Sequence, residues 1–148
     1  MGADPWFYVV PFQSDIQKAM EELQHEVFAT ANYRGSEDNP RNIDEARENA
    51  AESGTNSILD MYQVVDADLE HEDEDNVNFA NLAETMCRIF RLSDTDLRQL
   101  FNTTQPSLKM IESNRDFYDW LGRGVGVYIV AYTDKKPTEI VFAGYSID

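Results

Sequence analysis

The stretch VYIVAYTDKKPTEIVFAGY, residues 127–145, contains two apolar runs with a short polar segment between them. The first run is VYIVAYT (127–133), the second is TEIVFAGY (138–145), and DKKP separates them. Two β-branched and aromatic runs joined in this way are the sequence signal for a β-hairpin. We therefore expect an antiparallel pair of strands at this end of the sequence, joined by a four-residue loop.

A third strand is predicted over residues 6–12, which read WFYVVPF. Aromatic and β-branched residues favour strands, and an uninterrupted apolar run indicates burial on both faces. Pro11 has no backbone N–H to donate to a neighbouring strand, so it fits a strand end or a sheet edge. Because a strand that is apolar on both faces needs neighbours, we expect it to lie beside the C-terminal hairpin.

Helical patterns fill the middle of the sequence. Residues 14–33 place their apolar side chains in one stripe at helical spacing, which predicts a long amphipathic helix. A shorter helix is predicted over about 43–53, with Asn42 as its N-cap, and another over about 107–121. These helices connect the first strand to the hairpin.

Two segments are harder to assign. Residues 57–65, SILDMYQVV, are rich in branched apolar residues and are predicted as a strand. Residues 78–92 fit a helix, although CRIF (87–90) also fits a short strand. The helix is the favoured prediction for this second segment, and the strand stays open as its alternative.

The order of these elements predicts an α+β protein. A length of 148 residues indicates a single domain spanning 1–148, with enough chain to bury a core. Strands lie at both ends of the sequence, and we expect a small antiparallel or mixed sheet with the N-terminal strand beside the C-terminal hairpin. Several helices should cover one side of it. A flexible acidic loop is expected at about 66–77.

The charge of the chain excludes some classes of partner. The sequence has 28 acidic and 12 basic residues, for a formal net charge of −16. Binding to DNA, RNA or an anionic membrane requires clustered Lys and Arg, so these partners are not expected. A basic protein would instead be attracted. With only Cys87 as a thiol and no apolar run of about 20 residues, a cytoplasmic location is expected.

Residues 66–75, DADLEHEDED, form the densest acidic run. The run fits a solvated loop, a weak cation site or a hook for a basic partner. An EF-hand loop needs Gly at its sixth position, where this chain has His71, so no metal or cofactor is predicted. As a hook, the run would present these side chains to a partner: Glu70, Glu72, Asp73, Glu74 and Asp75.

Catalytic motifs are missing or incomplete. HEVFA (25–29) lacks the second His of a zinc protease helix, and GRGVG (122–126) precedes a strand rather than a helix. Asp60 and Glu139 lie in apolar runs, where burial would raise the pKa of a general acid. Each of these two acids also fits a position on the solvent side of a strand.

Tyrosines on the predicted strands could form a surface. If Tyr8, Tyr128 and Tyr132 share an uncovered face of the sheet, they would suit a protein partner or self-association. Core packing is the alternative interpretation of the same three residues. Their position therefore depends on which faces the helices cover.

Three functional hypotheses follow from the sequence. The first is a non-catalytic interaction protein, of adaptor or of inhibitor and immunity type, that engages a basic partner. The second is a small enzyme that uses carboxylates such as Asp60 or Glu139. The third is a structural homodimer that associates through the sheet tyrosines.

Overall fold

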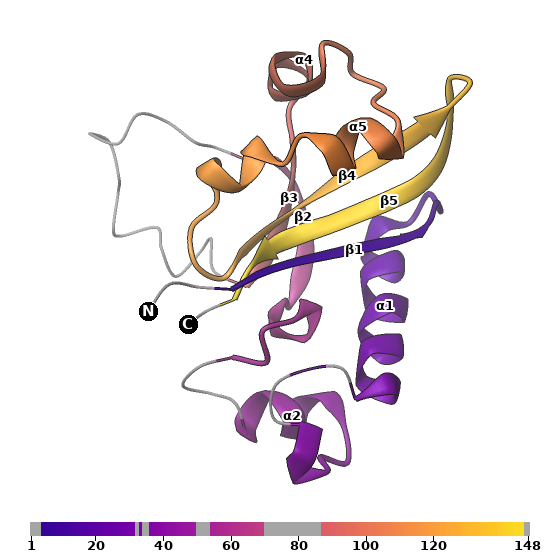
Figure 1. Ribbon diagram of the computed structural model, residues 1–148. Helices are drawn as coiled ribbons and strands as arrows, with labels where there is room; N and C mark the ends of the chain where they lie inside the picture. Colours follow the sequence, from indigo (N-terminus) through magenta and orange to yellow (C-terminus); the bar gives the residue numbers. More distant parts are fainter. Residues whose placement is uncertain (1–3, 32, 34–35, 50–53, 70–86, 147–148) are drawn as a thin grey trace.

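A five-stranded mixed sheet forms the centre of the computed structural model, which describes residues 4–31, 33, 36–49, 54–69 and 87–146 (Figure 1). The strand order is β1-β5-β4-β3-β2; β1 and β4 run antiparallel to β5, whereas β2, β3 and β4 are mutually parallel. The α+β class and the N-terminal strand beside the hairpin are confirmed. The strands are β1 (Pro5–Pro11), β2 (Gln63–Asp68), β3 (Arg88–Arg91), β4 (Val125–Thr133) and β5 (Lys136–Tyr145).

Helices lie on both faces of the sheet, so the expectation that they cover one side is wrong. Alternate residues of β5 point to opposite faces: Val141 joins one apolar cluster and Phe142 joins the other. Because both faces are apolar, each needs its own cover. α1 and η2 cover one face, and α4, α5 and η5 cover the other. The helices and 3-10 turns are α1 (Ile16–Thr30), η1 (Ser36–Asp38), α2 (Ile43–Asn49), η2 (Ile58–Asp60), α4 (Asp94–Phe101), α5 (Leu108–Ser113) and η5 (Asp116–Trp120).

The hairpin of β4 and β5 closes through two residues rather than the predicted four. Asp134 and Lys135 have φ angles of 51° and 67°, and Thr133 pairs with Lys136 across the turn. Two consecutive positive φ angles give the mirror-image turn whose twist matches that of antiparallel strands. Lys136 and Pro137 therefore belong to β5, and the predicted loop is too long.

The predicted strand over 57–65 is divided in two. Its first part is the 3-10 turn η2, and β2 begins only at Gln63. The Ser57 side chain accepts a hydrogen bond from the backbone N–H of Leu59 at 3.2 Å. Such local side-chain bonds compete with a strand ladder, and here the turn is the result. The apolar side chains of η2 still enter the core, as the sequence pattern suggested.

β3 shows that the helix favoured for 78–92 is wrong over Arg88–Arg91, where the structure has a strand. Arg88 pairs with Val125, so the short run enters the centre of the sheet, where β-branched and aromatic residues fit. Within the predicted acidic loop, residues 66–68 belong to β2 and Leu69 is buried, so that part of the loop is also wrong. Residues 70–77 of the predicted loop, and residues 78–86 of the predicted helix, lie outside the described residues.

β1 is an edge strand, and its prolines explain how it tolerates that place. The Phe12 N–H donates to the carbonyl oxygen of Thr138, and the Asp4 carbonyl oxygen accepts the N–H of Ser146, so both residues bond toward β5. Because backbone groups alternate in direction along an antiparallel strand, those of Pro5 and Pro11 turn outward. Proline has no N–H, so two of the outward donors are absent from the edge. The expected edge or end position of Pro11 is confirmed.

Trp6 of β1 lies flat across two glycines on neighbouring strands. A Cβ at Gly144 would lie 2.5 Å from Trp6 Cζ2 and 2.7 Å from the carbonyl oxygen of Val125. A Cβ at Gly126 would lie 2.9 Å from Trp6 Cη2. The indole ring therefore fills the space that side chains would otherwise take, and it covers the sheet on the α1 side.

Substituting Gly144→Ala should lower the free energy of unfolding by about 1–3 kcal/mol, because the new methyl group overlaps a backbone carbonyl that cannot move away. Gly122→Ala is the matched control, since nothing lies within 4 Å of its added Cβ, and it should stay within about 0.5 kcal/mol of the parent. Urea unfolding of the three proteins measures both changes. Equal stability of the two variants would contradict this packing.

Candidate functional site

The buried segment that contains η2 connects α1, α2 and the sheet. Ile58, Leu59 and Met61 are fully buried, and a helical turn that ends inside a protein leaves carbonyl oxygens without partners. Gln24 of α1 donates from Nε2 to the Ile58 and Met61 oxygens, at 2.9 and 2.7 Å. Arg47 of α2 donates to the Leu59 and Met61 oxygens, at 2.5 and 2.8 Å. Two side chains therefore tie both helices to this turn.

Asp60, one of the two predicted acids, is buried in the same segment with only 4% of its surface exposed. Its Oδ1 accepts a hydrogen bond from the Thr55 N–H at 2.6 Å, while no described residue bonds to its Oδ2. A Cβ at Gly54, where φ is 72°, would come within 2.7 Å of that oxygen. Burial raises the pKa of Asp60, and bonds from the 55–56 backbone and the charge of Arg47 oppose the rise.

Cys87 lies near this carboxylate in a strained backbone conformation with a φ of 65°. Burial raises the pKa of its thiol, and the negative charge of Asp60 adds to the rise. A raised pKa keeps the sulfur protonated, whereas the thiolate is the form that acts as a nucleophile. The arrangement around Asp60 and Cys87 therefore holds a loop in place and does not activate the thiol.

A groove of about 560 Å³ opens beside this buried segment, between α1 and α2. In Figure 1, α2 lies below the sheet, beside the lower end of α1. The buried Met20 and Gln24 and the half-buried Arg47 line the groove from within the protein. The other lining residues, all but Ile43 exposed, are Glu21, His25, Asn42, Ile43, Asp44 and Tyr62.

Glu21 is held at the groove by Gln17, which precedes it by one turn of α1. The Gln17 Nε2 donates to the Glu21 carboxylate at 3.3 Å, and its Oε1 accepts the N–H of Val64 at 2.7 Å. The same amide therefore joins α1 to β2 and orients a carboxylate on one wall of the groove. On the other wall, Asn42 caps α2 as predicted, accepting the Glu45 N–H at 2.8 Å.

Arg47 has little capacity left for an incoming ligand. Its Nε and one Nη donate to buried carbonyls, and the other Nη lies 3.6 Å from the Asp44 carboxylate. The guanidinium also lies over the ring of Tyr62, 4.9 Å from the centroid. The groove therefore presents the Asp44 and Glu21 carboxylates and an aromatic ring, with its internal cation already engaged.

A second, smaller groove of about 200 Å³ lies where β3 ends, between the start of α1 and the α4 region. Tyr128 and Tyr132 both line it, together with Arg91, which pairs with Asp68 at 2.8 Å. Burial raises the pKa of Tyr128. Neither groove is lined by Asp60 or by Glu139, so the two predicted acids do not meet in either groove.

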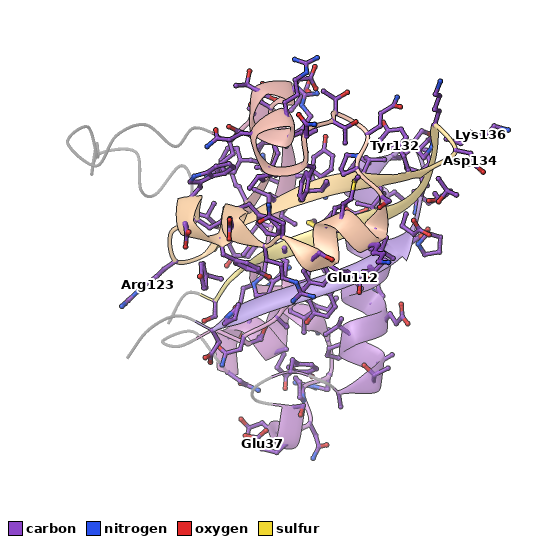
Figure 2. The ribbon with its side chains drawn as sticks, turned by 45° about the horizontal axis from the view of Figure 1, so that its top comes forward. Glu37, Glu112, Arg123, Tyr132, Asp134 and Lys136 are labelled. Carbon is purple, nitrogen blue, oxygen red and sulfur yellow. The ribbon has the colours of Figure 1, made fainter. Side chains whose placement is uncertain are left out.

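The predicted tyrosines do not form an open sheet face. Tyr8 and Tyr128 pack at the margin of the apolar cluster beneath α1, and Tyr8 lies 5.9 Å from the Trp6 ring. Figure 2 shows Tyr132 near the tip of the hairpin, toward Asp134. Glu139 is half-buried and accepts a hydrogen bond from the Thr138 hydroxyl at 2.5 Å. The predicted contacts Glu70, Glu72, Asp73, Glu74 and Asp75 lie outside the described residues.

Sequence reasoning missed the groove. Arg47 follows Ile43 by four residues, which places it on the inward side of α2, and this spacing was the available signal. Tyr62 belongs to the segment 57–65, which was predicted as a buried strand, so an exposed tyrosine was not expected there. Glu21 was one of several acids on the polar face of α1, and nothing in the sequence distinguished it.

The described residues hold no group of three or more His, Cys, Asp or Glu side chains arranged for a metal ion. Among the described helices, none is both long enough and apolar enough to cross a membrane. Comparison with protein-family models found no matching family, and neither curated proteins nor solved structures gave a match.

The buried carboxylate of Asp60 predicts a specific pH dependence. Because its pKa is raised above the ordinary value of 3.8, the folded state binds the proton more tightly than the unfolded state. The stability of the parent relative to Asp60→Asn should therefore fall as pH rises above about 4, and level off beyond the folded pKa. At pH 3.5, where that difference has not yet developed, Asp60→Ala should cost about 1–3 kcal/mol, because the Thr55 N–H loses its acceptor.

Urea unfolding between pH 3.5 and pH 8 measures this difference. Asp116→Asn, at an exposed position on η5, removes the same charge and should stay within about 0.5 kcal/mol of the parent throughout. A parent that became more stable relative to Asp60→Asn as pH rises would contradict a buried, proton-binding Asp60.

Proposed function

We propose that this protein is a non-catalytic interaction protein of the cytoplasm, of adaptor or of inhibitor and immunity type, that engages a basic protein partner. The observation that supports it is the uneven distribution of acidic residues. The described residues of 15–49, which contain α1 and α2, include nine acidic and three basic side chains. Residues 94–120, which contain the helices of the opposite face, include five acidic and three basic side chains.

The excess on the α1 and α2 side lies at the surface. Glu22 and Glu26 on α1 and Glu48 on α2 are exposed, as are the Glu21 and Asp44 carboxylates at the groove. A concentrated negative field speeds the approach of a positively charged protein and orients it toward that face. The proposed partner therefore meets the α1 and α2 side first.

The geometry gives less support to catalysis. A general acid must reach its substrate, but Asp60 is buried with its hydrogen bonds directed into its own loop. Glu139 binds the neighbouring Thr138 hydroxyl and lines neither groove. Burial holds the pKa of the Cys87 thiol high, which disfavours a nucleophilic role. An interaction surface is the better-supported function.

The partner should bind through charge, so its affinity should fall by at least about tenfold between 50 and 500 mM salt. Capture from a lysate of the source cells at low salt, with elution at high salt, would supply the partner. Titration of the purified pair by calorimetry would then give the dissociation constant at each salt concentration. The absence of a basic partner, or a salt-independent affinity, would contradict the proposal.

Two triple variants test whether binding depends on where the negative charges lie or only on their total number. Glu22→Gln, Glu26→Gln and Glu48→Gln remove three charges from α1 and α2, whereas a matched set removes three from α5 and η5: Glu112→Gln, Asp116→Asn and Asp119→Asn. The first set should weaken binding several-fold more than the second. Equal effects would mean that net charge alone attracts the partner, and the assignment to this face would fall.

A further inference from the structure

The groove between α1 and α2 combines three features that suit one chemical group. Carboxylates stand on both of its helices, at Glu21 and Asp44, and Tyr62, which also lines the groove, is 62% exposed. We propose that this groove is the docking site for an arginine side chain of the basic partner. The inference rests on the proposed function and adds where the partner binds and which residue it inserts.

The guanidinium group matches the groove because it is planar and carries five N–H donors. It can pair with a carboxylate through two parallel hydrogen bonds while its plane lies on an aromatic ring. The orientation of Glu21 by Gln17 provides a carboxylate in a fixed position on α1. The Tyr62 ring provides the flat surface for stacking.

Arg47 shows that the local chemistry accepts a guanidinium. The Arg47 group already lies over the Tyr62 ring and beside Asp44, with its other donors directed to buried carbonyls. An incoming arginine would use the exposed side of the same ring and the Glu21 carboxylate. The engagement of Arg47 also argues against an anionic ligand, which Glu21 and Asp44 would repel.

The size of the groove favours a peptide over a free ion. A volume of about 560 Å³ lies within the range of sites that enclose a small organic molecule. Of the two basic side chains, arginine fills more of that space, because its planar guanidinium is larger than the ammonium group of lysine. The buried Met20 offers an apolar contact for the aliphatic part of the side chain.

The direct test is an NMR titration of the full-length, ¹⁵N-labelled protein with three probes. These are the N-acetyl methylamides of arginine, lysine and glutamate. The arginine probe should shift groove resonances, including those of His25 and Asn42, and bind at least about threefold more tightly than the lysine probe. The glutamate probe should cause no shifts there. Equal binding of arginine and lysine, or binding of glutamate, would overturn the inference.

Matched variants assign the contacts. Glu21→Gln and Tyr62→Leu should each weaken arginine binding by about two- to fivefold, while Tyr62→Phe, which keeps the ring, should not. Glu112→Gln on α5, which packs on the face of the sheet opposite to α1, is the control for the loss of one charge and should bind as the parent does. Dispersed amide spectra identify the variants that are folded.

The same variants separate this inference from the proposed function. If the basic partner binds with salt-sensitive affinity and neither Glu21→Gln nor Tyr62→Leu weakens it, the groove is not the docking site and the proposed function stands. If no basic partner binds at all, both fall. Weakening by both groove variants, with Glu112→Gln unchanged, supports the inference.

Discussion

The carbonyl oxygens of the buried η2 turn need hydrogen-bond partners, and the arrangement of the whole α1 and α2 region follows from how they obtain them. A buried carbonyl without a partner costs about 1–3 kcal/mol, and the Leu59 and Met61 carbonyls here obtain their donors from side chains. Gln24 and Arg47 supply the donors from two different helices. The positions of those helices relative to the sheet are therefore fixed by polar bonds as well as by apolar packing.

The same bonds connect stability to the proposed binding site. The partly buried Arg47 guanidinium is surrounded by two carbonyls, the Asp44 carboxylate and the Tyr62 ring. Hydrogen bonds that involve a charged group are stronger than neutral ones, and here they tie α1 and α2 to the same turn. The groove is the space that remains between the two helices. Binding there would meet walls that are already in place.

The sequence predicted the parts of the fold that depend on local pattern. β1, β4 and β5 could be predicted as strands because each reads as a nearly continuous apolar run. Such a run is typical of a strand that is buried on both faces. The sequence prediction was wrong where contacts outside the local pattern set the structure. The Ser57 side chain bonds to the Leu59 N–H and favours the η2 turn over a strand. Pairing with β4 makes residues 88–91 a strand. The groove could not be predicted, because its residues come from α1, from α2 with its N-cap, and from Tyr62 just before β2, which only the fold brings together.

Charge and shape contribute differently to the proposed recognition. The net charge of −16 was readable from composition, but the acidic excess among the described residues of α1 and α2 could be assigned to one side only once the helices were placed on opposite faces. A broad negative surface accelerates encounter with any basic protein and discriminates little among them. Discrimination requires groups at fixed positions, such as Glu21 held by Gln17 and Tyr62 held by Arg47. In the proposed recognition, the acidic face would therefore set the rate of encounter and the groove would set the specificity.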